Sequence, residues 1–206
     1  HLLGDRLCLR HADLHALSWW DLYRSLQMRI ELTRRFKRWR HGRGFGIHSP
    51  FAYSFVKETL RQKLPYYAYE LIDAMTFADD SETDIGAAKL KLIFRIAVRF
   101  SPTRVAVVGK RNAEALRKVV AMALPRKADI NSQIENAKMV IVCDGAAAPA
   151  QSEAVYIFPD TEACAPGACD RIWDGVTRGM RFDNGKDMTI IVVASHLPRQ
   201  RFSIKF

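Results

Sequence analysis

One stretch of the chain, residues 104–113, has the residue types of a turn that binds a nucleoside or a phosphate. Its first half is an apolar run, residues 105–108, which predicts a buried parallel strand. Apolar residues at helical spacing follow over residues 113–124 and predict a helix. In doubly wound folds, ligands bind at the turn between such a strand and such a helix. The chemistry expected here is therefore ligand binding by backbone groups.

The turn itself contains a single glycine. Backbone that approaches a ligand closely and adopts positive φ needs glycine, and only Gly109 provides it, followed by Lys110, Arg111 and Asn112. Asn112 tolerates unusual backbone angles, so Gly109 and Asn112 can border a nucleoside. Lys110 and Arg111 favour an anionic ligand such as phosphate at a helix N-terminus. The alternatives are that Gly109 only joins the strand to its helix and that both cations are solvated.

Two aspartates follow apolar runs that predict further strands. Asp144 comes after residues 139–143, and Asp160 comes after residues 154–158. At the carboxyl end of a strand, Asp144 can hold the amino group of a cofactor, coordinate a divalent cation or act as a base. The alternative is that it accepts backbone N–H groups of a turn. If Asp144 and Asp160 converge, they form a minimal cation site.

Metal binding has no further support in the sequence. The four cysteines, Cys8, Cys143, Cys164 and Cys169, contain no Cys-x-x-Cys pair, and the histidines after residue 17 show no paired ligand spacing. Cys143 lies inside an apolar run. We therefore predict buried or incidental free thiols and no structural metal.

His48 and a group of tyrosines are the other candidates for chemistry. His48 lies in the glycine-rich stretch 41–50, which predicts a shaped loop, and can act as a base or hold a substrate. The alternative is that it fixes the loop by hydrogen bonds. Tyr66, Tyr67 and Tyr69 can stack on an aromatic substrate, but their helical spacing favours core packing.

The pattern along the chain changes at residue 104. Before it, helices are predicted over residues 19–39, 50–63, 66–75 and 85–100. After it, strands and helices alternate, which predicts an α/β fold of Rossmann-like, doubly wound type with a mostly parallel sheet. The predicted strands are 104–108, 139–143, 154–158, 188–194 and 202–206, and the helices are 113–124, 170–178 and a short one near 132–137. Residues 195–200 are too few for a crossover, so the last two strands are expected to pair as an antiparallel hairpin.

Length and composition fit one α/β domain with an N-terminal helical extension. The chain has 206 residues, 49% of them hydrophobic, enough for a sizeable core. No apolar run reaches the roughly 18 to 20 residues that cross a bilayer, and the first residues lack the layout of a signal peptide. These observations predict a soluble, cytoplasmic protein. Residues 1–17 are treated as a tail that need not belong to the fold.

The net charge of +10 is concentrated near the N-terminus. Residues 1–43 hold ten of the Lys and Arg residues against four Asp and Glu. The densest part, the basic segment of residues 29–43, includes Arg34, Arg35, Lys37, Arg38 and Arg40 around Phe36 and Trp39. Cations interleaved with aromatic residues suit nucleic acid or an anionic membrane surface. The alternative is a solvated amphipathic helix at one edge of the domain.

Three stretches of the chain resemble a bacterial family of class I S-adenosylmethionine-dependent methyltransferases, of O-methyltransferase type. Residues 42–51, Gly-Arg-Gly-Phe-Gly-Ile-His-Ser-Pro-Phe, with Tyr-Tyr-Ala-Tyr at 66–69, resemble its N-terminal cap and Gly-x-His-Ser-Pro-Phe signature. Residues 140–145, Val-Ile-Val-Cys-Asp-Gly, resemble its strand ending in Asp-Gly. Residues 188–206 resemble its closing hairpin, in which an antiparallel strand enters the parallel sheet. The resemblance spans about residues 36–206, and its first stretch is the most distinctive.

The resemblance implies an activity, a cofactor and a set of site residues. The activity is methyl transfer from S-adenosylmethionine to an oxygen of a small molecule or other acceptor, by proximity and orientation. His48 and Asp144 would be catalytic, with His48 as the base. The cofactor would contact Val108, Gly109, Asn112, Asp144 and Gly145. The domains implied are a helical cap at 18–84 and a methyltransferase-like domain at 85–206.

The chain departs from the family in each loop that would face the cofactor. The first turn lacks the family's acid and multi-glycine run. Where the family has a carboxylate for the ribose, between residues 124 and 139, the acid singled out here is Asp129. Residues 146–150, Ala-Ala-Ala-Pro-Ala, replace polar residues. The sequence therefore allows two functions. One is a methyltransferase whose cofactor site is weakened or lost, and the other is a non-catalytic binding protein of the same fold that engages an anionic partner through the basic segment.

Overall fold

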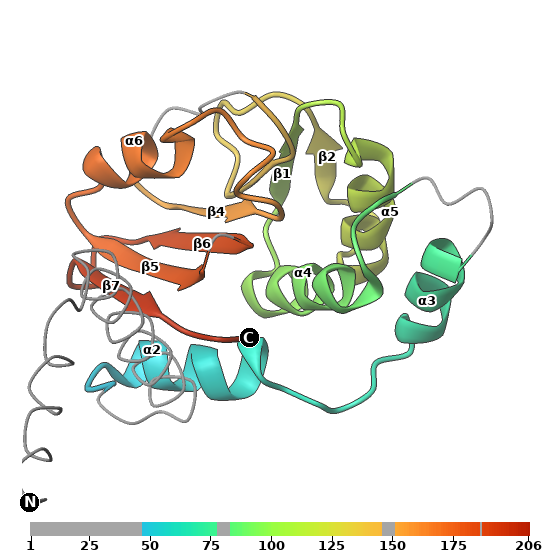
Figure 1. Cartoon of the computed structure of the whole chain (residues 1–206), viewed down its shortest axis with the longest axis horizontal. Helices are drawn as coiled ribbons and strands as arrows, with labels where there is room; N and C mark the ends of the chain where they lie inside the picture. Colours follow the sequence, from blue (N-terminus) through green and yellow to red (C-terminus); the bar gives the residue numbers. More distant parts are fainter. Residues whose placement is uncertain (1–46, 78–82, 146–150, 186) are drawn as a thin grey trace, which may run out of the picture. The chain divides into compact units, whose positions relative to one another are not determined.

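The computed structural model describes residues 47–77, 83–145, 151–185 and 187–206 (Figure 1). All of them belong to one compact unit, Lys37–Phe206. The predicted helix at 19–39, the basic segment and the loop 146–150 lie outside the described residues.

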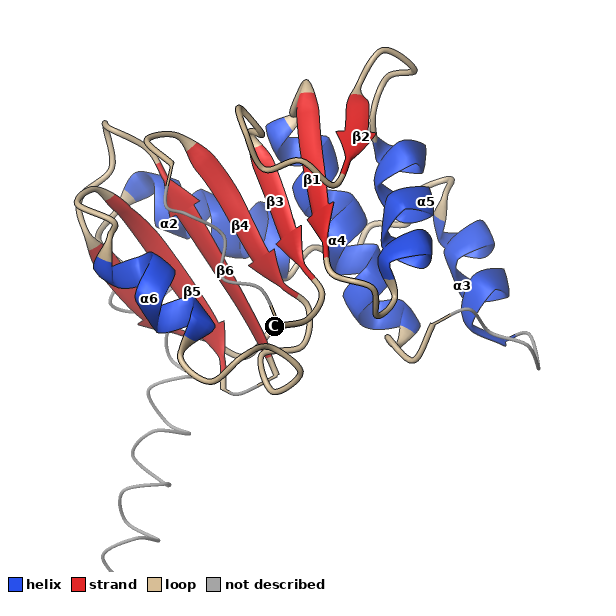
Figure 2. Ribbon diagram, turned by 90° about the horizontal axis from the view of Figure 1, so that it is seen from above, coloured by secondary structure: helices blue, strands red, loops and turns tan. Residues whose placement is uncertain are grey.

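The core element is a seven-stranded mixed sheet with the strand order β2-β1-β3-β4-β6-β5-β7 (Figure 2). Strands β1, β3, β4 and β6 are apolar and mostly buried on both faces, as expected for strands covered by helices on either side. The strands are β1 (Arg104–Val108), β2 (Asp129–Asn131), β3 (Met139–Val142), β4 (Ala154–Phe158), β5 (Gly179–Asn184), β6 (Met188–Val193) and β7 (Gln200–Ser203).

One strand of this sheet runs against all the others. β2, β1, β3 and β4 pair in parallel, and β6 is antiparallel to both of its neighbours, β4 and β5. The expected antiparallel hairpin therefore exists, but β5 and β6 form it. The prediction that the last two strands pair with each other is wrong, because β7 pairs in parallel with β5. The link from β6 to β7 only has to pass β5, about 10 Å across, which a handful of residues can span.

Helices cover the two faces of the sheet unequally. The side chains of α4 and α5 pack on one face, together with those of α2, the π-helical η1 and Ile72 of α3. Helix α6 covers the other face, and Figure 2 shows it in front of the strands with α4 and α5 behind. The helices are α2 (Pro50–Phe55), η1 (Val56–Leu60), α3 (Tyr69–Phe77), α4 (Ala87–Phe100), α5 (Ala113–Ala123) and α6 (Ala168–Asp174).

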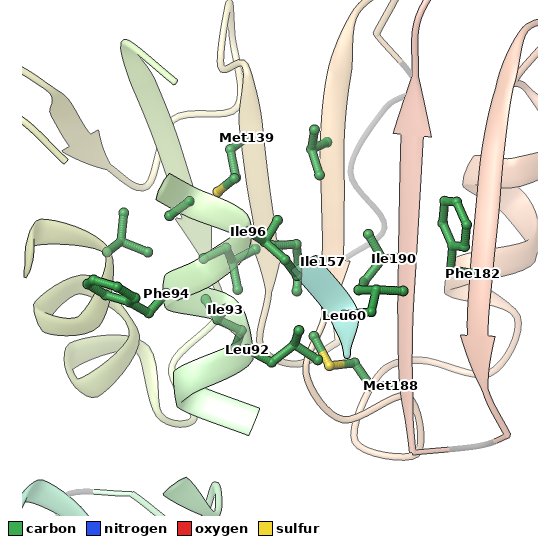
Figure 3. Close-up of a cluster of buried hydrophobic side chains, with 14 of the residues drawn as sticks. Leu60, Leu92, Ile93, Phe94, Ile96, Met139, Ile157, Phe182, Met188 and Ile190 are labelled. Carbon is green, nitrogen blue, oxygen red and sulfur yellow. The ribbon is translucent and has the colours of Figure 1, made fainter. Parts of the chain in front are cut away.

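The larger core explains why α4 forms where it does. Its apolar residues Leu90, Ile93, Phe94 and Ala97 recur with helical spacing and are fully buried. Figure 3 shows Ile93 and Ile96 of α4 beside Ile157 of β4 in the same cluster. Burying a side chain of this size stabilises the fold by about 1.5 to 3 kcal/mol.

Two arginines of α4 attach the first described helices to this core. Arg95 donates from Nε to the carbonyl of Thr59 at 2.8 Å, from Nη2 to that of Leu60 at 3.3 Å and from Nη1 to Tyr69 Oη at 2.9 Å. The first two bonds satisfy carbonyl groups that the end of η1 leaves unpaired. Arg99 donates to Ser54 Oγ at 2.8 Å and pairs with Glu58. The segment 47–60 is thus held on α4 by charge-assisted bonds as well as by packing.

The predicted tyrosine packing is confirmed for two of the three tyrosines. Tyr66 and Tyr69 lie 5.5 Å apart between ring centroids, and both contact the ring of Phe94. Tyr67 is 78% exposed, although the edge of its aromatic system also meets Phe94, at 6.1 Å between ring centroids. The free, buried state predicted for the thiols is confirmed for Cys143, Cys164 and Cys169; Cys8 lies outside the described residues.

One predicted helix does not form, and two strands, β2 and β5, were not predicted. The short helix expected near 132–137 does not form, and the chain there makes turns after the three-residue strand β2. β5 was not expected because its sequence, Gly-Met-Arg-Phe-Asp-Asn, reads as polar. Among the described helices, none combines the length and the apolar composition that a membrane span requires.

Candidate functional site

The predicted ligand-binding turn lies at the carboxyl ends of β1 and β3. β1 ends at Val108, Gly109 follows with φ of +105°, and Asn112 adopts a left-handed conformation with φ of +60° before α5 begins. Asp144 follows β3 and lies directly against Gly109. A Cβ atom at position 109 would stand 2.5 Å from Asp144 Oδ1, so only glycine fits there. We call residues 109–112 the β1–α5 turn.

The carboxylate of Asp144 binds the backbone of this turn. The N–H groups of Lys110 and Arg111 both donate to Asp144 Oδ2, at 3.0 and 2.9 Å. Consecutive N–H groups of this kind, beside a helix N-terminus, are the groups with which a protein holds an anion. Here the anion is supplied by the chain itself. The alternative that Asp144 accepts backbone N–H groups is therefore the observed arrangement, but in the turn after β1 rather than in the turn that follows Asp144.

A second acid, Asp84, holds the other side of the turn. Asp84 accepts a hydrogen bond from Arg111 Nε at 2.9 Å and another from the side-chain amide of Asn112. The backbone N–H of Asp84 donates back to Asn112 Oδ1 at 3.1 Å. Arg111 Nη1 also lies 3.5 Å from Asp160 Oδ2. Arg111 and Asn112 were expected to face solvent or a ligand. Their polar groups instead form hydrogen bonds and ion pairs with other residues of the chain.

The protonation of the site follows from these contacts. The hydrogen bond from Arg111, followed by the one from Asn112, lowers the pKa of Asp84 below its ordinary value. The backbone N–H groups of Arg111 and Lys110 lower the pKa of Asp144. The pKa of Arg111 is raised, first by its hydrogen bond to Asp84. Both carboxylates and the guanidinium are therefore charged at neutral pH.

Asp144 and Asp160, the two aspartates proposed as a cation site, do lie close to each other. Both contact Arg111, which is a cation of the chain itself. Asp144 binds the backbone N–H of Arg111, and Asp160 faces its guanidinium. Asp160 Oδ1 also accepts the backbone N–H groups of Glu162 and Ala163. Within residues 47–206, apart from the undescribed positions, no group of three His, Cys, Asp or Glu side chains could hold a metal ion.

The position that would hold a ribose carries no acid. β2 ends at Asn131, whose Oδ1 accepts the N–H of Gln133 at 2.8 Å in a local turn. Asp129, the acid singled out in the sequence, begins β2 and pairs with Arg104 at 3.1 Å. Since β1 and β2 are parallel, this pair lies at the edge of the sheet opposite to Gly109.

His48 lies away from Asp144. Its neighbour Ser49 caps α2 and donates from Oγ to Met180 Sδ at 3.9 Å, near the start of β5. β5 runs in the same direction as β1 and β3, so its start is at the opposite edge of the sheet from the β1–α5 turn. The structure therefore does not bring together the two residues expected to share catalysis.

The remaining predicted contacts lie beside the turn. The carbonyl of Val108 accepts the N–H of Cys143 at 2.8 Å, which ties β1 to β3. Gly145 is exposed, with φ of +49°. Asp84 was not among the site residues expected from the sequence; it lies between the helices predicted over residues 66–75 and 85–100. The only signal in the sequence was the opposite charge of Asp84 and Arg111. Because the two residues are 27 positions apart, no local pattern pairs them.

Compared with known proteins, this chain matches no protein-family model, and no curated protein or solved structure is similar to it.

Proposed function

We propose that this chain is a non-catalytic relative of the class I methyltransferases, a binding protein that engages an anionic partner. The observation that carries the proposal is the carboxylate of Asp144, which takes the two N–H groups of the β1–α5 turn and fills the space over Gly109. A turn closed in this way does not fit S-adenosylmethionine.

The relationship to methyltransferases is supported by the order of the strands. The resemblance implies an antiparallel strand inserted near the end of a parallel sheet, and β6 lies in this way between β4 and β5. The Gly-Ile-His-Ser-Pro-Phe stretch, residues 46–51, leads into α2, which packs on the same core as the sheet. These features support common ancestry with the family and say nothing about activity.

Loss of the cofactor is supported at two separate places. At the first, a ligand would have to displace the ionised carboxylate of Asp144 from the two backbone N–H groups that it accepts. At the second, Asn131 takes the place of the acid that would bind the ribose hydroxyls. The separation of His48 from Asp144 also removes the expected base from the turn.

Titration calorimetry of the full chain with S-adenosylmethionine and S-adenosylhomocysteine tests this proposal. We expect no saturable heat at ligand concentrations up to the millimolar range. Saturable binding in the micromolar range would overturn the proposal and favour the alternative, an active methyltransferase. The variant Asp144→Ala opens the turn without restoring the ribose acid, so we expect it to bind no better than the wild type.

The binding role is supported by charge. The chain carries a net charge of +10, and proteins with such an excess attract anionic surfaces. The basic segment stays a predicted contact for nucleic acid or another anionic surface, through Arg34, Arg35, Lys37, Arg38 and Arg40.

A further inference from the structure

Strand β7 is the last strand of the sheet, at the end opposite to β2 (Figure 1). It pairs with β5 on one side, and no described strand pairs with its outer edge. The N–H of Ile204 donates to the carbonyl of Asp183 at 2.9 Å. Because successive residues of a strand direct their N–H groups to opposite sides, those of Arg201 and Ser203 point away from β5. The outer edge of β7 therefore offers backbone groups to a further strand.

The side chains of this segment divide between the two faces of the sheet. Phe202 and Ile204 are buried in the larger core. The guanidinium of Arg199 lies over the ring of Trp173 in α6, 4.9 Å from its centroid. Because side chains alternate along a strand, the odd-numbered residues lie on the α6 face. We call Arg199, Arg201 and Lys205 the cationic row.

The cationic row is accessible from solvent. The side chains of Arg199 and Arg201 are 46% and 56% exposed, and Lys205 is exposed. Arg201 uses Nε to bind Asp183 at 2.7 Å, and Arg199 Nη2 lies 4.0 Å from Asp174 Oδ1, a long distance for an ion pair. Within the described residues, no carboxylate pairs with Lys205.

We infer that the outer edge of β7 binds an extended acidic segment of a partner protein, which joins the sheet as an added strand. In this mode of recognition, main-chain hydrogen bonds give affinity and alternate side chains give specificity. Carboxylates at alternate positions of the added strand would lie directly beside the cationic row. Residues 197–206 contain no Asp or Glu, so the edge strand itself supplies no competing carboxylate.

Charge and chemistry favour an acidic peptide over the other occupants. Antiparallel pairing of β7 from two copies would place the two cationic rows side by side, which is unfavourable. The basic segment of the chain itself has the same sign of charge as the row. Nucleic acid would meet the cations without a ring to stack on, because Phe202 is 7% exposed and Trp173, under Arg199, is 8% exposed.

This inference deepens the proposed function by naming a class of anionic partner and rests on it only in that respect. The calorimetry with S-adenosylmethionine decides the loss of the cofactor, whereas a peptide and variants of β7 decide the contact at the edge. Failure of one proposal is therefore distinguishable from failure of the other.

Fluorescence anisotropy of a labelled peptide with the full chain tests the inference. The peptide alternates valine and glutamate over about ten residues, and a matched peptide carries lysine in place of glutamate, both at about 0.1 M salt. We expect saturable binding of the glutamate peptide only. The double variant Arg199→Gln with Lys205→Gln should weaken this binding about tenfold or more.

Substitutions at Ser203 test the backbone pairing. Ser203→Pro removes an N–H that points to the outer edge and leaves the hydrogen bonds to β5 in place, a position where edge strands tolerate proline. We expect it to weaken peptide binding about tenfold, whereas Ser203→Ala keeps the N–H and should bind like the wild type.

Two further controls make the test specific. Arg126→Gln with Lys127→Gln makes the same change of charge between α5 and β2, at the other end of the sheet, and should leave peptide binding unchanged. Circular dichroism should show that every variant keeps the wild-type secondary structure.

The possible results separate the occupants. Absence of saturable peptide binding overturns the inference, as does binding that Ser203→Pro leaves unchanged, because charge alone would then account for it. Tighter binding of single-stranded oligothymidine, weakened by Arg199→Gln with Lys205→Gln, would overturn it in favour of nucleic acid. Light scattering after size exclusion that shows a dimer, dissociated by Ser203→Pro, would overturn it in favour of a second copy.

Discussion

The carboxylate of Asp144 lies at the place that a side chain on residue 109 would need. An ideal Cβ on Gly109 would stand 2.5 Å from Asp144 Oδ1 and 2.9 Å from both Cγ and the backbone nitrogen of Asp144. The glycine that looks like a binding feature in the sequence is thus required by a contact within the chain. The β1–α5 turn and the start of the loop after β3 fit each other as two parts of one surface.

Replacement of this glycine tests the contact directly. Gly109→Ala must accommodate a clash with Asp144 at a φ of +105°, so we expect the free energy of unfolding to fall by about 3 kcal/mol. Gly145→Ala is the matched control, because Gly145 also has positive φ but no atom within 4 Å of an added Cβ. It should lose only about 1 kcal/mol. Urea denaturation of both variants measures the difference, and equal losses would show that the clash with Asp144 is absent.

Features of the site that depend on local sequence patterns could be predicted, whereas contacts between residues far apart in the sequence could not. Gly109, Asn112 and Asp144 were singled out because strand and helix periodicity places them at element ends, and the structure brings them to one turn. The bonds from Asp144 to the turn join residues 33 and 34 positions apart, and no local pattern indicates which donor a carboxylate will choose. Ser49 likewise meets Met180 across 131 positions, which is why the location of His48 was not foreseen.

Strands with a clear local pattern could be predicted, and strands without one could not. The bounds of β1 and β4 were predicted as the structure has them, because a short apolar run between turns is typical of a buried strand. β5 was missed because Arg181 and Asp183 make it look exposed, although they are only 4% and 5% exposed and neutralise each other. β2, with three residues, is too short to carry a pattern.

Acid should weaken the β1–α5 turn. The pKa values of Asp144 and Asp84 lie below the ordinary value of 3.8 in the folded chain. Their contribution to stability is therefore complete above about pH 4 and is lost as the pH falls through the folded-state pKa values. We expect Asp144→Asn to cost about 1 kcal/mol at pH 7, since water can solvate the freed, exposed N–H groups, and to converge with the wild type near pH 2.

Urea denaturation between about pH 2 and pH 7 measures this dependence. Asp174→Asn is the control, because Asp174 is 78% exposed in its side chain and lies 4.0 Å from Arg199. Its unfolding free energy should run parallel to that of the wild type. A difference between Asp144→Asn and the wild type that stays constant down to pH 2 would contradict the assigned role of the carboxylate charge.

Arg95 should resist conservative replacement. Its guanidinium reaches Thr59, Leu60 and Tyr69 at once, and the single ammonium group of a lysine cannot match that fork geometry. We expect Arg95→Lys to lower the free energy of unfolding by about 2 kcal/mol, because carbonyl groups at the end of η1 lose their donors. Tyr69→Phe removes one of the three bonds and should cost about 1 kcal/mol or less. A loss for Arg95→Lys no larger than that for Tyr69→Phe would show that the carbonyl contacts contribute nothing.

The largest single loss is expected at the buried ion pair of β5. Arg181 Nε donates to Asp183 Oδ1 at 2.8 Å, and Asp183 also accepts from Thr189 Oγ1 at 2.9 Å and from Arg201 Nε at 2.7 Å. Asp183→Ala removes the acceptor of three donors and leaves Arg181 with Asp170 alone, at 2.6 Å. Breaking a buried pair from one side costs about 3 to 5 kcal/mol, since the remaining charge stays out of water.

The control for this prediction lies in the same network. Asp170→Asn changes the other partner of Arg181, whose side chain is 61% exposed, and leaves the pair with Asp183 in place. We expect it to cost no more than about 1 kcal/mol. Because β7 pairs with β5 and Arg201 binds Asp183, loss of Asp183 should also release the C-terminal strand. Hydrogen exchange of the amides of β7 should therefore accelerate in Asp183→Ala and not in Asp170→Asn, and equal exchange in the two variants would refute the link between the ion pair and the edge strand.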